Sequence, residues 1–187
     1  MTVFPIHTES SAPAGAKDSL AAIRGSLGFV PNLMGLLAEA PEALGAYLSL
    51  SSLFEASSLG PVERQVVLLA TSFVNGCDYC MAAHSGLAKM QGVPEDVVAS
   101  LRDGRPIADP RLEALRAFTA AVTERRAVVS EAEVESFLAA GFTRRQLLEV
   151  LLGVTQKTLS NYVNHLARTP LDTAFKPMQW APPAAKP

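Results

Sequence analysis

The chain has little of what disulfide-bonded, membrane or nucleic-acid-binding proteins need. Two cysteines among 187 residues exclude a scaffold held by several disulfides. The 16 Lys and Arg residues nearly balance 18 Asp and Glu residues, and without a basic block we expect no nucleic-acid partner. No apolar run reaches the roughly 20 residues that cross a bilayer, and the N-terminus lacks the pattern of a secretory signal. We therefore expect a cytoplasmic protein with no membrane partner.

Helix signals recur along the whole chain, whereas strand signals are nearly absent. Prolines stand at the start of several apolar-periodic runs, where a missing N–H costs nothing. Ser130 with Glu133, and Thr143 with Gln146, form capping boxes. The pattern predicts an all-α fold with helices at 17–27, 32–39, 41–55, 61–74, 77–91, 94–102, 110–125, 130–139 and 143–168.

The two ends differ in composition from the middle. Residues 1–16 are rich in Ser, Ala, Pro and Gly and predict a flexible N-terminal arm. Residues 176–187 are rich in proline and predict an extended tail. One helical domain is expected between them, over 17–175. Trp180, the only tryptophan, should be exposed or pack on a neighbouring subunit.

Both cysteines lie in the segment CDYC at 77–80, and a histidine follows one helical turn later. Cys77, Cys80 and His84 stand at positions i, i+3 and i+7, which share one face of a helix. A Cys-x-x-Cys pair can form or break a disulfide with little backbone movement. If the Asn-Gly pair at 75–76 interrupts the preceding helix, both thiols fall in a first turn, where the helix dipole stabilises a thiolate. The spacing favours a redox dithiol with a nearby proton carrier.

Two other interpretations of this face remain open. Cys77, Cys80 and His84 could hold a metal ion, although a fourth ligand from a second Cys/His cluster is missing. The cysteines could also be small buried hydrophobes beside a satisfied core histidine. Metal analysis of protein purified under reducing conditions separates the first from the others.

The segment ERQVVLLATSFVNGCDYCMAAHSGLAKMQGVP resembles AhpD-like alkylhydroperoxidases and the carboxymuconolactone decarboxylase family. The shared pattern is an acidic, apolar helix, an Asn-Gly break and then Cys-x-x-Cys-x-x-x-His. The resemblance extends to LGFVPNLMGLLAEAPEALGAY and, more loosely, to LLEVLLGVTQKTLSNYVNHLARTPLD. It implies an AhpD-like helical bundle with the Cys-x-x-Cys motif at the start of a central helix, assembled into a homo-oligomer.

The resemblance also implies a peroxidase that needs no cofactor and no metal. Cys80 would attack a hydroperoxide and become a sulfenic acid, and Cys77 would condense with it to a disulfide. His84 would carry protons to and from the thiols. A dithiol reductant, in relatives a lipoyl-bearing protein, would restore the pair. Because the decarboxylase branch lacks paired cysteines, their presence disfavours that activity.

One departure from the family pattern concerns the acid of the proton relay. In the hydroperoxidases this acid stands twelve residues before the first cysteine, a position that is Gln65 here. A glutamine can orient an imidazole but cannot accept a proton at neutral pH. Glu63 is the nearest carboxylate, but a shift of two residues turns a side chain by about 200° around a regular helix. Glu63 could instead favour the dipole of its own helix.

Polar residues in the last helix are further candidates. Asn161 and His165 could line a pocket beside His84, although bridging between helices is the commoner role of such side chains. Tyr79 could orient a substrate or pack at an interface. Two alternatives to the peroxidase follow: a non-catalytic redox-sensing or assembly protein, and a carboxymuconolactone decarboxylase-like enzyme that acts on a small carboxylated substrate.

Overall fold

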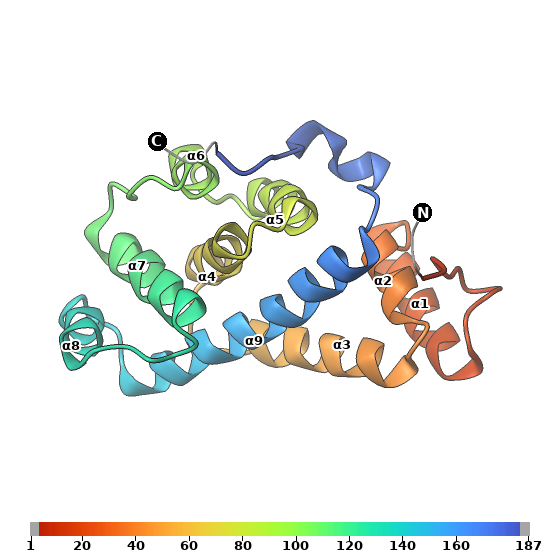
Figure 1. Ribbon diagram of the computed structural model, residues 1–187, viewed down its shortest axis with the longest axis horizontal. Coiled ribbons are helices and arrows are strands. Elements are labelled where there is room, and N and C mark those ends of the chain that lie inside the picture. Colours follow the sequence, from red (N-terminus) through yellow and green to blue (C-terminus); the bar gives the residue numbers. More distant parts are fainter. Residues whose placement is uncertain (1–3, 184–187) are drawn as a thin grey trace.

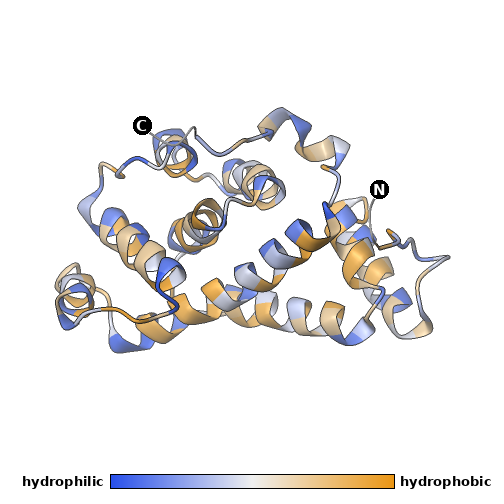
Figure 2. Cartoon of the chain, viewed as in Figure 1, coloured by the Kyte–Doolittle hydropathy of each residue, from blue (hydrophilic) through white to orange (hydrophobic). Residues whose placement is uncertain are grey.

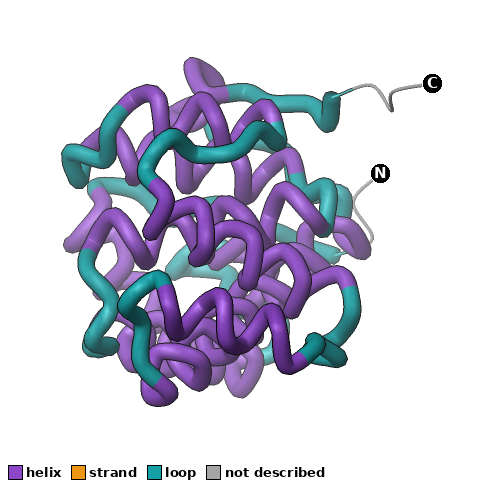
Figure 3. The backbone as a smooth tube through the Cα atoms, turned by 90° about the vertical axis from the view of Figure 1, so that its left-hand side faces the viewer, coloured by secondary structure: helices purple, strands orange, loops and turns teal. Residues whose placement is uncertain are grey.

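The computed structural model describes residues 4–183, and every regular element in that range is a helix (Figures 1 and 3). The prediction of an all-α fold is therefore confirmed. The elements are α1 (Ala14–Leu27), α2 (Asn32–Leu37), α3 (Pro41–Glu55), α4 (Pro61–Val74), α5 (Asp78–Met90), α6 (Glu95–Asp103), α7 (Pro110–Glu124), α8 (Glu131–Ala139), α9 (Arg144–Ala167) and the 3-10 helix η1 (Thr173–Met178).

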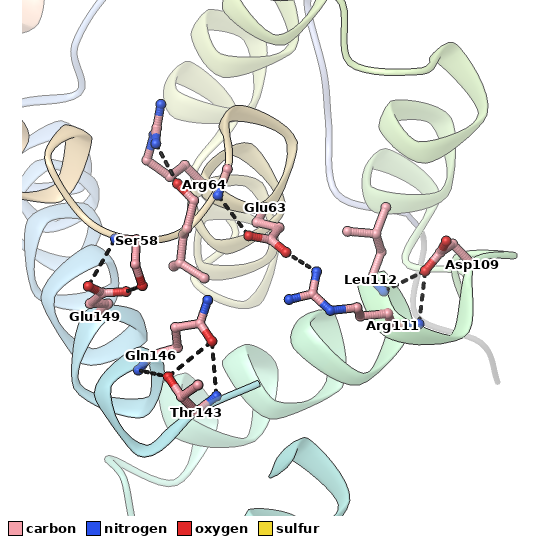
Figure 4. A network of polar contacts seen from close by, with 11 residues as sticks. Ser58, Glu63, Arg64, Asp109, Arg111, Leu112, Thr143, Gln146 and Glu149 are labelled. Carbon is pink, nitrogen blue, oxygen red and sulfur yellow. Dashed lines mark hydrogen bonds and ion pairs between the residues drawn. The ribbon is translucent and has the colours of Figure 1, made fainter. Parts of the chain in front are cut away.

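The helices begin where the local chemistry predicts. Pro41, Pro61 and Pro110 occupy first-turn positions, and the Asp109 carboxylate accepts hydrogen bonds from the amides of residues 111 and 112 (Figure 4). Thr143 caps α9 through its capping box. Five starts differ from the prediction: α5, α6, α8 and α9 each begin one residue later, and α1 begins three residues earlier, at Ala14.

The centre of the fold is α4, which packs against α5, α7 and α9, while α3 lies along α9 (Figure 1). One buried apolar cluster surrounds α4, α7 and the first half of α9. A second joins α1, α2 and α3 to the start of α5, and it contains both cysteines. The apolar faces of the helices turn toward one another in Figure 2. None of the helices within residues 4–183 is long and apolar enough to cross a membrane.

The N-terminal segment is docked, which differs from the flexible arm expected for 1–16. The amide of His7 donates to the carbonyl of Gly35 over 3.0 Å, and Ala12 and Ala16 are buried. A Cβ on Gly35 would lie 2.6 Å from the His7 carbonyl oxygen. Small residues here allow the chain to pack closely on α2, and α1 already begins at Ala14. Residues 1–3 of the expected arm lie outside the described range.

The C-terminal segment is also docked on its own chain. Trp180 is 9% exposed, its indole N–H donates to the carbonyl of Arg102 over 2.8 Å, and its ring centroid lies 5.8 Å from that of Phe73. The Arg102 guanidinium donates to the carbonyls of Met178 and Gln179. Neither placement expected for Trp180 therefore holds, because α6 and α4 supply its partners. Residues 184–187 of the expected tail lie outside the described range.

The contact of α9 with α3 and α4 depends on Gly153. A Cβ at this position would lie 2.6 Å from Cζ of Phe54 and 2.8 Å from Cγ1 of Val67, and both of these side chains are buried. We expect Gly153→Ala to lower the free energy of unfolding by about 1–3 kcal/mol, because a packed core has no room for the methyl group. Urea denaturation followed by circular dichroism measures this change.

The matched control for this prediction is Gly45→Ala, in the exposed middle of α3, where an added Cβ meets nothing within 4 Å. This variant should gain about 0.5–1 kcal/mol, since alanine is the better helix former. Equal stability of the two alanine variants would contradict the proposed close contact.

Candidate functional site

A sharp break between α4 and α5 positions the two cysteines. Gly76 has φ of 64°, and the Cys77 amide donates to the carbonyl of Ser72 over 2.9 Å. Cys77 is the extended N-cap residue of α5, and Cys80 is in its first turn. The helix break at 75–76 therefore lies where the sequence predicts it.

Both thiols are free and buried, but they have different surroundings. Cys80 lines a cavity of about 590 Å³, whereas Cys77 is not among the residues that line it. The cavity walls are mainly apolar, and the buried polar groups among them include Gln65, Cys80, His84, Gln156 and Lys157. A molecule in this cavity would therefore meet the sulfur of Cys80 and not that of Cys77.

Lys157, from the middle of α9, is the functional group that the sequence analysis missed. Its side chain is fully buried, at 1% exposure. Its Nζ lies 2.7 Å from Nε2 of His84 and 3.8 Å from Sγ of Cys80, and it faces the ring of Tyr47. One signal in the sequence points to it: Lys157, Ser160 and Asn164 stand at positions i, i+3 and i+7 and so share one face of the helix.

The same helix face supplies polar contacts to both sulfurs. The Asn164 side-chain amide donates to Cys80 Sγ over 3.2 Å and lies 3.7 Å from Cys77 Sγ. The Ser160 hydroxyl lies 3.7 Å from Cys80 Sγ. These contacts stabilise negative charge on sulfur.

The environment assigns opposite protonation states to the two thiols. A hydrogen bond from the Cys77 thiol lowers the pKa of Cys80 below the ordinary thiol value, and the charge of Lys157 lowers it further against the opposing effect of burial. The same hydrogen bond, together with burial, raises the pKa of Cys77. Burial lowers the pKa of Lys157, but the interactions with Cys80, Tyr47 and Cys77 together outweigh it, so the net pKa is raised. The surroundings thus favour the thiolate at Cys80 and the neutral thiol at Cys77.

His84 is held between Lys157 and Gln65. Its Nε2 faces the Lys157 ammonium, and its Nδ1 lies 3.2 Å from Oε1 of Gln65. The Gln65 side chain in turn donates to Oε1 of Gln91 over 3.0 Å. Because an ammonium has only protons to offer, Nε2 accepts and Nδ1–H donates to the glutamine. Burial and then the charge of Lys157 lower the pKa of His84 well below its usual value, so the imidazole is neutral.

Glu63 is not brought to the site. Its Oε2 accepts a hydrogen bond from the Gly60 amide over 2.7 Å, and its Oε1 pairs with Arg111. Figure 4 shows these contacts at the start of α4, facing α7. Glu63 therefore caps its own helix and ties it to α7, while Gln65 faces His84.

The other polar candidates have structural contacts. Asn161 accepts from the Asn75 side chain over 2.9 Å and so bridges α9 to the end of α4. His165 is exposed. Tyr79 is buried within its own chain, where its hydroxyl donates to Asp172. Burial and then the Asp172 carboxylate raise the pKa of Tyr79. Within residues 4–183, no group of three or more His, Cys, Asp or Glu side chains is placed to hold a metal ion.

Several solved structures share this fold. An uncharacterized peroxidase-related protein from Ralstonia eutropha JMP134, described as an alkylhydroperoxidase AhpD core, is 22% identical, with a TM-score of 0.83 over 93% of this chain and 94% of that one. A peroxidase-related protein from Silicibacter sp. TM1040 is 21% identical, with a TM-score of 0.80 over 93% of each chain. The debrominase Bmp8, as a cysteine-to-alanine variant with 2,3,4-tribromopyrrole, is 17% identical, with a TM-score of 0.80 over 95% of this chain and 96% of that one.

The sequence comparison matches part of the chain to a known family. Residues 38–119 match the carboxymuconolactone decarboxylase family, whereas no curated protein matches the sequence. The chain thus has the AhpD-like fold, and the family match covers less than half of its 187 residues. The matched segment contains Gln65, Cys77, Cys80 and His84, while Lys157 lies outside it.

Proposed function

We propose that this protein is a cysteine-based peroxidase that reduces organic hydroperoxides through a dithiol/disulfide cycle of Cys77 and Cys80. The observation that carries the proposal is the asymmetry of the pair. Cys80 lines the cavity with its pKa lowered, and Cys77 stands behind it as a neutral thiol. A peroxidatic cysteine must be a thiolate and accessible to its substrate, whereas a resolving cysteine need only reach the sulfenic acid.

The reaction proceeds in three steps. The Cys80 thiolate attacks the terminal oxygen of the hydroperoxide, the O–O bond breaks, and Cys80 becomes a sulfenic acid while an alcohol is released. The Cys77 thiol condenses with the sulfenic acid, giving a disulfide and water. A dithiol reductant, for which a lipoyl-bearing protein is one candidate, then restores both thiols by exchange.

The cavity favours an alkyl or aryl hydroperoxide over hydrogen peroxide. Apolar side chains make up most of its wall, among them Phe29, Leu33, Met34, Leu48 and Phe175. Its volume of about 590 Å³ lies within the ordinary range of small-molecule sites. Met90 is exposed and belongs to the lining, so the cavity reaches the surface beside it.

The proposal is tested first by the stoichiometry of thiol oxidation and then by turnover with a reductant. One equivalent of cumene hydroperoxide should remove both thiols and lower the protein mass by two hydrogen atoms, as a disulfide forms. Dihydrolipoamide should then restore the thiols and sustain turnover. Oxidation without sustained reduction by any dithiol would instead support a redox-sensing role, and thiols that resist the hydroperoxide would refute the proposal.

Reductive dehalogenation is a second candidate, favoured by the thiolate at the base of an apolar cavity. The similar fold of the debrominase Bmp8 supports it at the level of architecture alone. In this reaction the dithiol would become a disulfide while a carbon–halogen bond is replaced by carbon–hydrogen and halide is released. Bromide release from 2,3,4-tribromopyrrole, measured against cumene hydroperoxide reduction, decides between the two substrates.

A further inference from the structure

A buried ammonium without a carboxylate partner is the unusual feature of the site. None of the ion pairs between described side chains includes Lys157. The titratable groups that face it are Cys77, Cys80 and His84 from the start of α5 and Tyr47 from α3. A buried charge is retained only when it is paired. Cys80 is therefore the counter-ion of Lys157, and the two form a lysine–thiolate pair.

The His84 imidazole cannot relay a proton into the site through its Nδ1 atom. His84 receives a hydrogen bond from Lys157 at Nε2, and its Nδ1–H ends on the amide oxygen of Gln65. The next link is a second amide, that of Gln91. Neither amide exchanges a proton at neutral pH, so among residues 4–183 the cationic acid in contact with both the sulfur and the imidazole is Lys157.

We propose that Lys157 is the catalytic acid of the peroxidase, donating the proton that the leaving alkoxide needs when the O–O bond breaks. This inference rests on the proposed function. The thiolate sulfur forms a bond to the terminal oxygen, which keeps its hydrogen. The inner oxygen leaves with the bonding electron pair and takes a proton from the ammonium. The products are a sulfenic acid, an alcohol and a neutral Lys157 amine.

The neutral Lys157 amine then acts as a base in the second step, the formation of the disulfide. It accepts the proton of the Cys77 thiol as that sulfur attacks the sulfenic acid, and it passes the proton to the departing hydroxide, which leaves as water. Once the disulfide has formed, Lys157 takes up a proton from solvent. That uptake balances the proton released when a dithiol restores the Cys80 thiolate. His84 and Gln65 are positioning residues in this scheme, because they hold the Nζ of Lys157 in place.

The test compares two peroxides whose leaving groups differ in basicity. Cleavage of tert-butyl hydroperoxide releases an alkoxide that must be protonated, whereas peracetic acid releases acetate, which need not be. Single-turnover oxidation of Cys80 is measured for wild type, Lys157→Met and Lys89→Met. Lys89 is exposed on α5 and serves as the matched control. The pH profile of iodoacetamide alkylation gives the thiolate fraction of each variant, so that rates are compared per thiolate.

In Lys157→Met we expect the alkylation midpoint to rise toward that of an ordinary thiol, about 8.5. The rate per thiolate should fall about 10²–10³-fold with tert-butyl hydroperoxide, the usual size of an acid-catalytic effect. With peracetic acid it should stay within about threefold of wild type, since no proton transfer is lost. An equal loss with both peroxides, after the thiolate correction, would show that Lys157 only stabilises the thiolate and would overturn the inference.

A solvent isotope effect on the wild-type protein tests the same inference even if Lys157→Met fails to fold. The rate in D₂O should fall more for tert-butyl hydroperoxide than for peracetic acid, because only the first transfers a lysine proton in its transition state. Equal isotope effects would overturn the inference while leaving the peroxidase intact. A wild-type protein that reacts with neither peroxide would instead refute the proposed function, and the inference with it.

Discussion

Replacing Cys80 with serine is expected to lower the rate of organic hydroperoxide reduction at least about 10³-fold, as loss of a nucleophile typically does. Serine has nearly the shape of cysteine, so the first turn of α5 and the contact to Asn164 are kept. A serine hydroxyl, however, is not ionised beside Lys157 and cannot be oxidised to a sulfenic acid. The variant should therefore lose hydroperoxide reduction but keep the packing of the native protein.

The measurement is consumption of cumene hydroperoxide with dihydrolipoamide as reductant. Near-ultraviolet circular dichroism confirms that the variant keeps its packing. The internal comparison is the same exchange at Cys77, three residues earlier, which leaves the first chemical step intact. Turnover above about a tenth of wild type in Cys80→Ser would show that Cys80 is not the nucleophile, since loss of an essential thiolate leaves far less.

The helices were predictable because their signals are local. Proline at a first turn, a capping box and a terminal glycine act within a few residues, so the boundaries of α3 and α4 and the start of α7 follow from the sequence alone. The ends of the chain were less predictable. Composition suggested a mobile arm over 1–16, but small residues such as Ala12 and Ala16 also permit close packing on a neighbouring helix. Only the tertiary partner distinguishes these outcomes.

The site residues also divide into those that local sequence patterns predict and those that they do not. Cys77, Cys80 and His84 share one helix, so their common face follows from spacing, and the helical rotation separates Glu63 from Gln65 as expected. Lys157 is 73 residues beyond His84, and no local rule fixes which face of α9 turns toward α5. Its burial could be suspected from the apolar neighbours, but its contacts to sulfur and imidazole are properties of the packed helices.

Replacing Cys77 with serine should separate the first oxidation from the completed cycle. Cys77 is fully buried and does not line the cavity, so the hydroperoxide need not contact it. A serine hydroxyl can still donate a hydrogen bond to the Cys80 thiolate, which keeps the pKa of Cys80 low. We expect one equivalent of hydroperoxide to be reduced within about threefold of the wild-type rate, because the nucleophile is unchanged.

Sustained turnover of this variant should fall at least about a hundredfold, because the sulfenic acid has no neighbouring thiol with which to condense. The trapped intermediate should react with dimedone and add its mass to the protein, whereas wild type should give the disulfide and little adduct. Steady turnover at the wild-type rate would show that the external dithiol attacks the sulfenic acid directly. In that case the Cys77 thiol serves only to stabilise the thiolate of Cys80. The two cysteines would then differ in pKa, but Cys77 would not be a resolving cysteine.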